Sequence, residues 1–143
     1  MPIANYTTKV PADRSMQEIQ KMLTEHGASG ILTEFEKGTG RLDSLSFKIE
    51  IDGKLMGFRL PIKWREAQRV MQKQGVNRAN DDDYCYRVAW RILRDWVRAQ
   101  MALIEIQMVD LQEIFLPYAV QKNGRTLYEN VITDPNKLLG DGN

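Results

Sequence analysis

Apolar residues recur at helical spacing through residues 81–109, a stretch that contains neither Gly nor Pro. At about 1.5 Å per residue this stretch predicts a helix roughly 40 Å long. Its apolar side chains cover an arc wider than the stripe of about 100° found on an ordinary surface helix. They are Cys85, Tyr86, Ala89, Trp90, Ile92, Leu93, Trp96, Val97, Ala99, Met101, Leu103 and Ile104. A sheet on one side, with a second helix or another subunit on the other, would cover such an arc.

The remaining face of this predicted helix is basic. It carries four arginines at 4-3-4 spacing within an arc of roughly 60°, namely Arg87, Arg91, Arg94 and Arg98. Each guanidinium can hold a phosphate or a carboxylate with two hydrogen bonds. A plain solvated face is the alternative, because Asp83 and Asp95 each stand four residues from an arginine. The binding interpretation requires that the guanidiniums face solvent rather than carboxylates of the protein itself.

Alternation of apolar and polar residues predicts strands elsewhere. Residues 30–61 read as an antiparallel meander, in which Asp52-Gly53 supplies a two-residue hairpin turn. Residues 5–10 predict a further short strand, and residues 118–129 a second hairpin around Asn123-Gly124.

Shorter helices are predicted over residues 15–26, with Ser15 and Glu18 as a capping box, and over residues 62–74. A short helix follows Asp110 and ends before Pro117. Together these elements predict one α+β domain, a mainly antiparallel sheet packed on the long helix, over residues 1–133. Residues 134–143 predict a flexible C-terminal tail.

Composition adds two constraints. The chain of 143 residues has a formal net charge of +1, but residues 59–98 hold ten Lys or Arg against five Asp or Glu. This uneven charge favours an anionic partner. The single cysteine, Cys85, lies on the apolar side of the long helix and is expected to be a buried structural thiol. We also find no signal peptide and no apolar run long enough for a bilayer, which predicts a cytoplasmic protein.

Catalytic and metal-binding signatures are not found. His26 stands at the end of a predicted helix, where capping explains it. Gly38-Thr39-Gly40 lies between two predicted strands, so a hairpin turn is favoured over a phosphate-binding loop. The three aspartates that precede the long helix match no calcium-loop spacing. We therefore expect a non-enzymatic protein without a metal or cofactor.

Nucleic acid is the anionic partner that the basic positions favour. Further basic residues that would adjoin the arginine face are Lys63, Arg65, Arg69, Lys73 and Arg78. Trp64, Tyr84 and Trp90 could stack on bases, although each fits a core position equally well. Four phosphate contacts would give log K against log salt a slope of about −3 to −4. Replacing Arg91 and Arg94 by Glu should then abolish binding without unfolding the protein.

The segments NYTTKV, EIQKMLTEHGASGILTEF, FRLP, RVAWRILRDWVRAQMALIE and VDLQEIFLPY resemble a family of small proteins of uncharacterised activity from phages, prophages and other bacterial mobile elements. The resemblance implies a setting, the cytoplasm of a bacterial host, and carries over no activity or site residues. Two alternatives to nucleic-acid binding stay open. One is an anti-defence protein that binds a host immune protein or sequesters a signalling nucleotide; the other is a structural homo-oligomer, such as a homodimer, held by the wide apolar arc.

Overall fold

A three-stranded antiparallel meander forms the only sheet in the part of the chain that the structure, a computed structural model, describes: residues 2–134 and 136. Its strands are β1 (Ala28–Phe35), β2 (Leu42–Ile51) and β3 (Lys54–Pro61), in the order β1-β2-β3. Asp52 and Gly53 both have positive φ and join β2 to β3, as predicted. The fold is α+β, as the sequence predicted.

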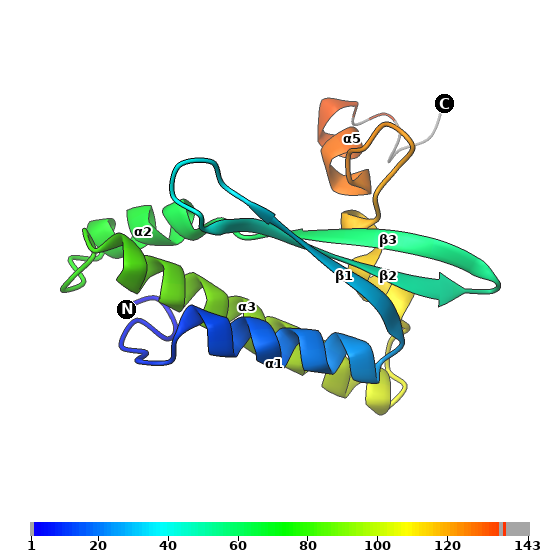
Figure 1. The fold of residues 1–143 in the computed structure, drawn as a ribbon, viewed down its shortest axis with the longest axis horizontal. Coiled ribbons are helices and arrows are strands. Elements are labelled where there is room, and N and C mark those ends of the chain that lie inside the picture. Colours follow the sequence, from blue (N-terminus) through cyan, green and yellow to red (C-terminus); the bar gives the residue numbers. More distant parts are fainter. Residues whose placement is uncertain (1, 135, 137–143) are drawn as a thin grey trace.

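Two helices lie side by side along one face of the sheet (Figure 1). They are α1 (Ala12–Glu25) and α3 (Asp82–Glu105), which run in the same direction. Helix α2 (Trp64–Lys73) also packs on α3. After α3, the chain forms α4 (Leu111–Phe115) and the 3₁₀ helix η1 (Leu116–Tyr118). Helix α5 (Leu127–Thr133) stands beyond the opposite face of the sheet.

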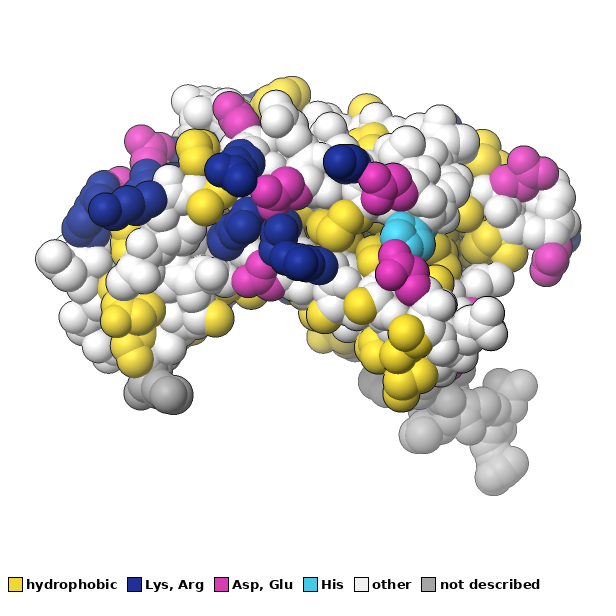
Figure 2. Space-filling model, turned by 90° about the horizontal axis from the view of Figure 1, so that it is seen from below, with side chains coloured by type: hydrophobic (Ala, Val, Ile, Leu, Met, Phe, Trp, Pro, Cys, Tyr) yellow, Lys and Arg dark blue, Asp and Glu magenta, His cyan; other side chains and the backbone are white. Residues whose placement is uncertain are grey.

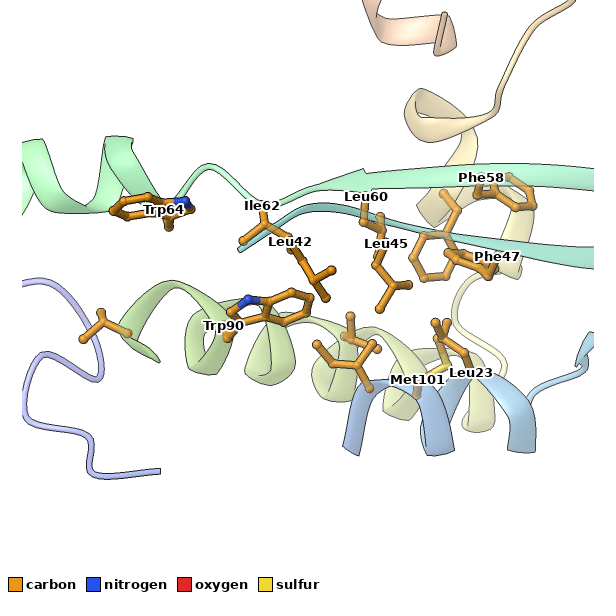
Figure 3. Close-up of a cluster of buried hydrophobic side chains, with 14 of the residues drawn as sticks. Leu23, Leu42, Leu45, Phe47, Phe58, Leu60, Ile62, Trp64, Trp90 and Met101 are labelled. Carbon is orange, nitrogen blue, oxygen red and sulfur yellow. The ribbon is translucent and has the colours of Figure 1, made fainter. Parts of the chain in front are cut away.

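The core fills the space between the sheet and these helices (Figure 3). Phe47 of β2 stacks on Phe58 of β3 with ring centroids 5.3 Å apart, and Phe115 meets Phe47 edge-on at 5.1 Å. Trp90 of α3 is fully buried opposite Leu42 and Leu45. The alternation along β2 therefore sends its apolar residues to the face that α3 covers.

The long helix is the organising element, although it is shorter than predicted. Asp81 caps it by accepting a hydrogen bond from the Tyr84 N–H at 3.1 Å. It ends at Glu105 rather than at residue 109, because Gln107 takes a positive φ and the Met108 N–H bonds back to the Leu103 carbonyl. This is a Schellman closure built without glycine, and residues 106–108 carry no local signal that predicts it.

Two strand predictions were wrong. Residues 5–10 form a turn and an irregular segment instead of a strand, with Asn5 at φ 61°. Residues 118–129 contain only two isolated bridges, Phe58–Ala119 and Val120–Thr126, around the expected turn. The segment ends in a helix, because Thr126 and Glu129 form a capping box that starts α5 at Leu127.

The start of the first helix was also predicted wrongly. The helix begins at Ala12 after Pro11, so Ser15 lies inside it, fully buried, and caps nothing. Proline is favourable at a helix start because its missing N–H would have no partner there. The predicted tail, residues 134–143, lies outside the described part of the chain except for Asp134 and Asn136.

Candidate anion-binding site

The central arginines of the long helix meet a carboxylate of α1. Arg91 Nη1 donates to Oε2 of Glu18 at 2.7 Å, and Arg94 Nε donates to the same oxygen at 2.6 Å. The side chains of Arg91 and Arg94 are only 17% and 15% exposed. These two guanidiniums therefore are not exposed to solvent. The prediction that all four arginines of the helix form an exposed face is wrong for its two central members, Arg91 and Arg94.

Glu18 does not neutralise the cations around it. Arg14, one turn earlier in α1, pairs with its other oxygen at 3.3 Å, so three guanidiniums share one carboxylate. Burial opposes ionisation of Glu18, but the hydrogen bonds and charges of Arg94 and Arg91 outweigh it and hold its pKa below the ordinary value. Glu18 therefore stays charged at neutral pH, and an excess of positive charge remains.

Several donors of this cluster remain unused. A guanidinium carries five N–H groups. Arg91 gives one hydrogen bond to Glu18, while Arg94 gives one to Glu18 and one to Asp95 at 3.1 Å. Figure 2 shows basic side chains gathered toward one end of this face of the molecule, away from the histidine.

The outer members of the arginine row have different surroundings. Arg98 is exposed and has no ion pair among the described residues. Arg87 is half-buried, with its guanidinium 5.2 Å from the ring of Tyr84, and Arg78 lies 4.7 Å from the same ring. Lys21 of α1 is exposed and lies three residues beyond Glu18, on the same side of that helix. We name Arg14, Glu18, Lys21, Arg91, Arg94, Asp95 and Arg98 the α1–α3 basic cluster.

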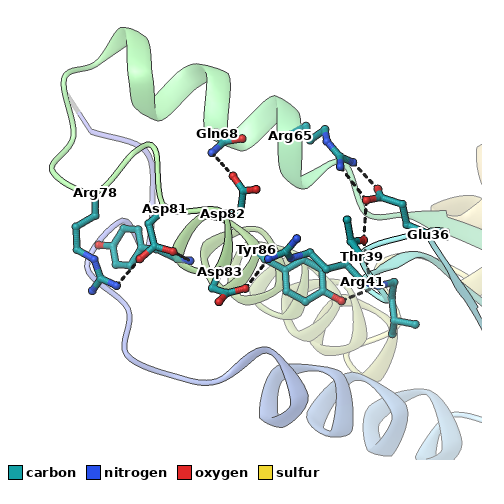
Figure 4. A network of polar contacts seen from close by, with 12 residues as sticks. Glu36, Thr39, Arg41, Arg65, Gln68, Arg78, Asp81, Asp82, Asp83 and Tyr86 are labelled. Carbon is teal, nitrogen blue, oxygen red and sulfur yellow. Dashed lines mark hydrogen bonds and ion pairs between the residues drawn. The ribbon is translucent and has the colours of Figure 1, made fainter.

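The basic residues of α2 are not brought to this cluster. Arg65 forms a bidentate pair with Glu36 and lies 4.3 Å from the ring of Trp64 (Figure 4). Arg69 pairs with Glu66 on its own helix, and Lys73 is exposed. Lys63 borders a groove on the apolar side of α3. The structure thus divides the predicted basic track into separate parts.

The three aromatic residues considered for base stacking belong to the core. Trp64, Tyr84 and Trp90 are 2%, 7% and 0% exposed. A nucleic acid lying on the basic cluster therefore could not stack its bases on them without rearrangement of the core.

A second polar network, which sequence reasoning missed, joins the β1–β2 loop to α3 (Figure 4). Arg41 donates to Asp83 at 2.6 Å and lies over the rings of Trp64 and Tyr86, and the Tyr86 hydroxyl accepts from the Leu42 N–H at 2.8 Å. Gly38 and Gly40 have positive φ in this turn, as hairpin chemistry requires. Gly38-Thr39-Gly40 therefore belongs to the turn between β1 and β2, as predicted. The contacts of Arg41 and Tyr86 hold this turn against α3.

A large groove lies on the side of α3 away from the basic cluster. It has a volume of about 1100 Å³ and is bounded by α2, α3, the end of β3, η1 and α5. Apolar side chains dominate its lining. The wide apolar arc of α3 is therefore only partly covered within one chain.

The remaining reactive side chains have structural surroundings. Cys85 is fully buried, donates to the Ala79 carbonyl at 3.3 Å, and has its pKa raised by burial. His26 contacts the Met22 carbonyl through Nδ1 at 2.8 Å and Glu105 through Nε2 at 3.2 Å, which ties the ends of α1 and α3 together. Across residues 2–134 and 136 no group of three His, Cys, Asp or Glu residues could hold a metal ion.

Comparison with known protein families, curated proteins and solved structures found no match to this chain. The resemblance to a phage and mobile-element family therefore stays a prediction. None of the helices described here has the length and apolarity that crossing a bilayer requires.

Proposed function

We propose that this protein is a non-enzymatic binding protein whose α1–α3 basic cluster takes an anionic polymer, most readily the backbone of a nucleic acid. Arg91 and Arg94 do not face solvent as the sequence-based interpretation required, so the proposal rests on the positive charge that remains where three guanidiniums share the single carboxylate of Glu18. Such a concentration of like charge costs folding free energy, which an incoming phosphate would offset.

Charge and donor geometry support the proposal. The cluster holds five basic side chains and two carboxylates, an excess of three positive charges. Arg98 and Lys21 are exposed at its edge, where a phosphate can reach them without entering the protein. Arg91 and Arg94 use only part of their N–H groups on Glu18 and Asp95, and the remaining donors can orient a phosphate.

The surroundings favour contact with the nucleic-acid backbone over base readout. The candidate stacking aromatics are buried, and phosphate contacts alone carry no sequence information. We expect similar affinity for duplexes of unrelated sequence. An excess of three charges would give a slope of about −3 for log K against log salt.

The structure dictates the choice of variants for the test. Arg91→Glu with Arg94→Glu would place carboxylates against Glu18 and disturb folding, so it is not a clean test. Lys21→Glu with Arg98→Glu changes the same charge at exposed positions. The matched control is Lys48→Glu with Lys54→Glu, two exposed lysines on the sheet hairpin.

Fluorescence anisotropy with a labelled DNA duplex and a labelled RNA hairpin at low salt measures the effect. We expect the cluster variant to lose about tenfold or more in affinity, and the control to lose much less. Equal losses in both variants, or no binding by the wild type, would refute the proposal.

The setting that we propose is the cytoplasm of a bacterium that carries a phage or mobile element. A signalling nucleotide is the alternative anion for the same cluster. A thermal-shift screen against cyclic nucleotides separates the two, because a nucleotide hit without polynucleotide binding would favour an anti-defence role by sequestration.

A further inference from the structure

The apolar groove beside α3 has a definite construction. Its floor includes Ala89, Leu93 and Trp96 of α3. One wall is α2, where Val70 is 40% exposed, and part of the opposite side is α5, where Ile132 is 56% exposed. Exposed apolar side chains that face one groove from two helices are typical of a surface that binds a partner.

The open shape of the groove favours a partner larger than a small molecule. Pockets for small ligands span roughly 300–1,000 Å³ and bury most of the ligand. This groove of about 1100 Å³ lies open between helices rather than enclosed. An α-helix with its side chains is about 10–12 Å wide and presents anchors at i, i+3, i+4 and i+7, which suits a helix-lined trough.

The charged residues around the groove indicate the sign of the partner. Four carboxylates line it, those of Glu34, Asp43, Glu66 and Glu129, against the cations of Arg59 and Lys63. Arg59 is already engaged by Glu129 at 3.4 Å and by the Gly124 carbonyl at 2.7 Å. Glu34 and Asp43 are exposed and have no ion pair within residues 2–134 and 136.

We propose that this groove binds an amphipathic helix of another protein, with its apolar stripe on the floor and Lys or Arg residues along its flanks. Glu34 and Asp43 supply the unpaired negative charge that such flanks would meet. These two carboxylates attract a basic helix and repel an acidic one, while the apolar contacts provide most of the affinity. The proposal is independent of the basic cluster, which lies on another side of α3.

A selection from a displayed library of helical peptides, randomised at surface positions on a fixed helical scaffold, tests this inference on the full chain. We expect enriched peptides to carry an apolar stripe and an excess of Lys and Arg. The tightest peptide, labelled and measured by anisotropy, should lose about tenfold or more in affinity toward Val70→Asp with Ile132→Asp. Glu34→Gln with Asp43→Asn should weaken it by a smaller factor and reduce the dependence on salt.

Leu32→Asp with Leu55→Asp is the matched control, because these leucines are 60% and 59% exposed on the sheet, outside the groove. This control should bind the peptide like the wild type. Circular dichroism of each variant establishes that the fold is kept.

The inference is overturned by a library without enrichment, by enrichment of acidic peptides, or by equal losses in control and groove variants. Light scattering that shows a dimer which only the groove variants dissociate would also overturn it, since the occupant would then be a second copy of this chain.

Discussion

Removal of the Glu18 charge should change stability and anion affinity in opposite directions. Glu18→Gln keeps the shape of the side chain but takes away the charge that Arg14, Arg91 and Arg94 share. The amide oxygen can still accept from Arg91 and Arg94, but without a negative charge, and the amide NH2 group can only donate and cannot accept from Arg14. The folded protein should therefore lose free energy of unfolding.

The size of this loss follows from the burial of the three partners. An exposed ion pair contributes about 0–1 kcal/mol, and breaking a fully buried one costs roughly 3–5 kcal/mol. Glu18 is 27% exposed, and Arg91 and Arg94 are 17% and 15% exposed. We therefore expect a loss of about 1–3 kcal/mol, which lowers the midpoint of urea unfolding by about 1 M.

The same substitution should strengthen anion binding. A carboxylate about 6 Å from a bound phosphate repels it by ~0.7 kcal/mol in water, which corresponds to about threefold in affinity. The salt slope should steepen by about one unit. Anisotropy with the labelled duplex measures both quantities.

The pH dependence supplies an internal check. The pKa of Glu18 in the folded protein lies below its ordinary value of 4.5. Its stabilising contribution is therefore fully present above that ordinary value and is lost as the pH falls through the lowered pKa. The difference in stability between wild type and Glu18→Gln should be constant near neutral pH and shrink on acidification below about 4.5.

Urea unfolding followed by tryptophan fluorescence measures the stability of the wild type, Glu18→Gln and the control Glu25→Gln. Glu25 is an exposed carboxylate on the same helix without an ion pair in the described structure, so its variant should differ little from the wild type. A Glu18→Gln protein as stable as the wild type would show that the Glu18 charge does not offset repulsion among the three guanidiniums. Weaker anion binding by that variant would show that Glu18 orients the arginines instead of competing with the anion.

Two further predictions concern the core and the β1–β2 loop. Phe47→Ala removes a ring that packs on both Phe58 and Phe115, so it should cost about 3–5 kcal/mol in urea unfolding; a loss below about 1 kcal/mol would mean that this cluster is loosely packed. Arg65→Met should raise the pKa of Glu36, which hydrogen bonds from Arg65 and Thr39 hold at about 2, toward its ordinary 4.5. An NMR titration of the Glu36 carboxyl checks this, and an unchanged pKa would show that Arg65 is not its partner in solution.

The parts of the fold that depend on local pattern were predictable. Leu45, Phe47 and Ile49 alternate with polar residues and all face the core, and Asp52-Gly53 makes the expected hairpin. The alternation at residues 5–10 was misleading because that segment pairs with no strand. Thr126 and Glu129 did carry a helix-start signal, but the nearby Asn123-Gly124 turn favoured a hairpin instead.

The candidate site was predictable only in part. The spacing of the α3 arginines placed them on one face of a helix, but it could not show which carboxylate they would meet. Glu18 stands 73 residues from Arg91 and 76 from Arg94, and its position depends on how α1 packs along α3. Long-range pairing of this kind has no local signal, and the division of the α2 cations from the cluster has the same cause.

The lone thiol has a practical consequence. Cys85 is fully buried, and its thiol donates to the carbonyl of Ala79 in the loop that precedes α3. Maleimide reagents should therefore leave the native chain unlabelled, and no background mutation is needed before dyes or spin labels are attached. Probes placed at engineered surface cysteines on α2 and α5 could then follow, within one molecule, how far apart these two helices move when a ligand arrives.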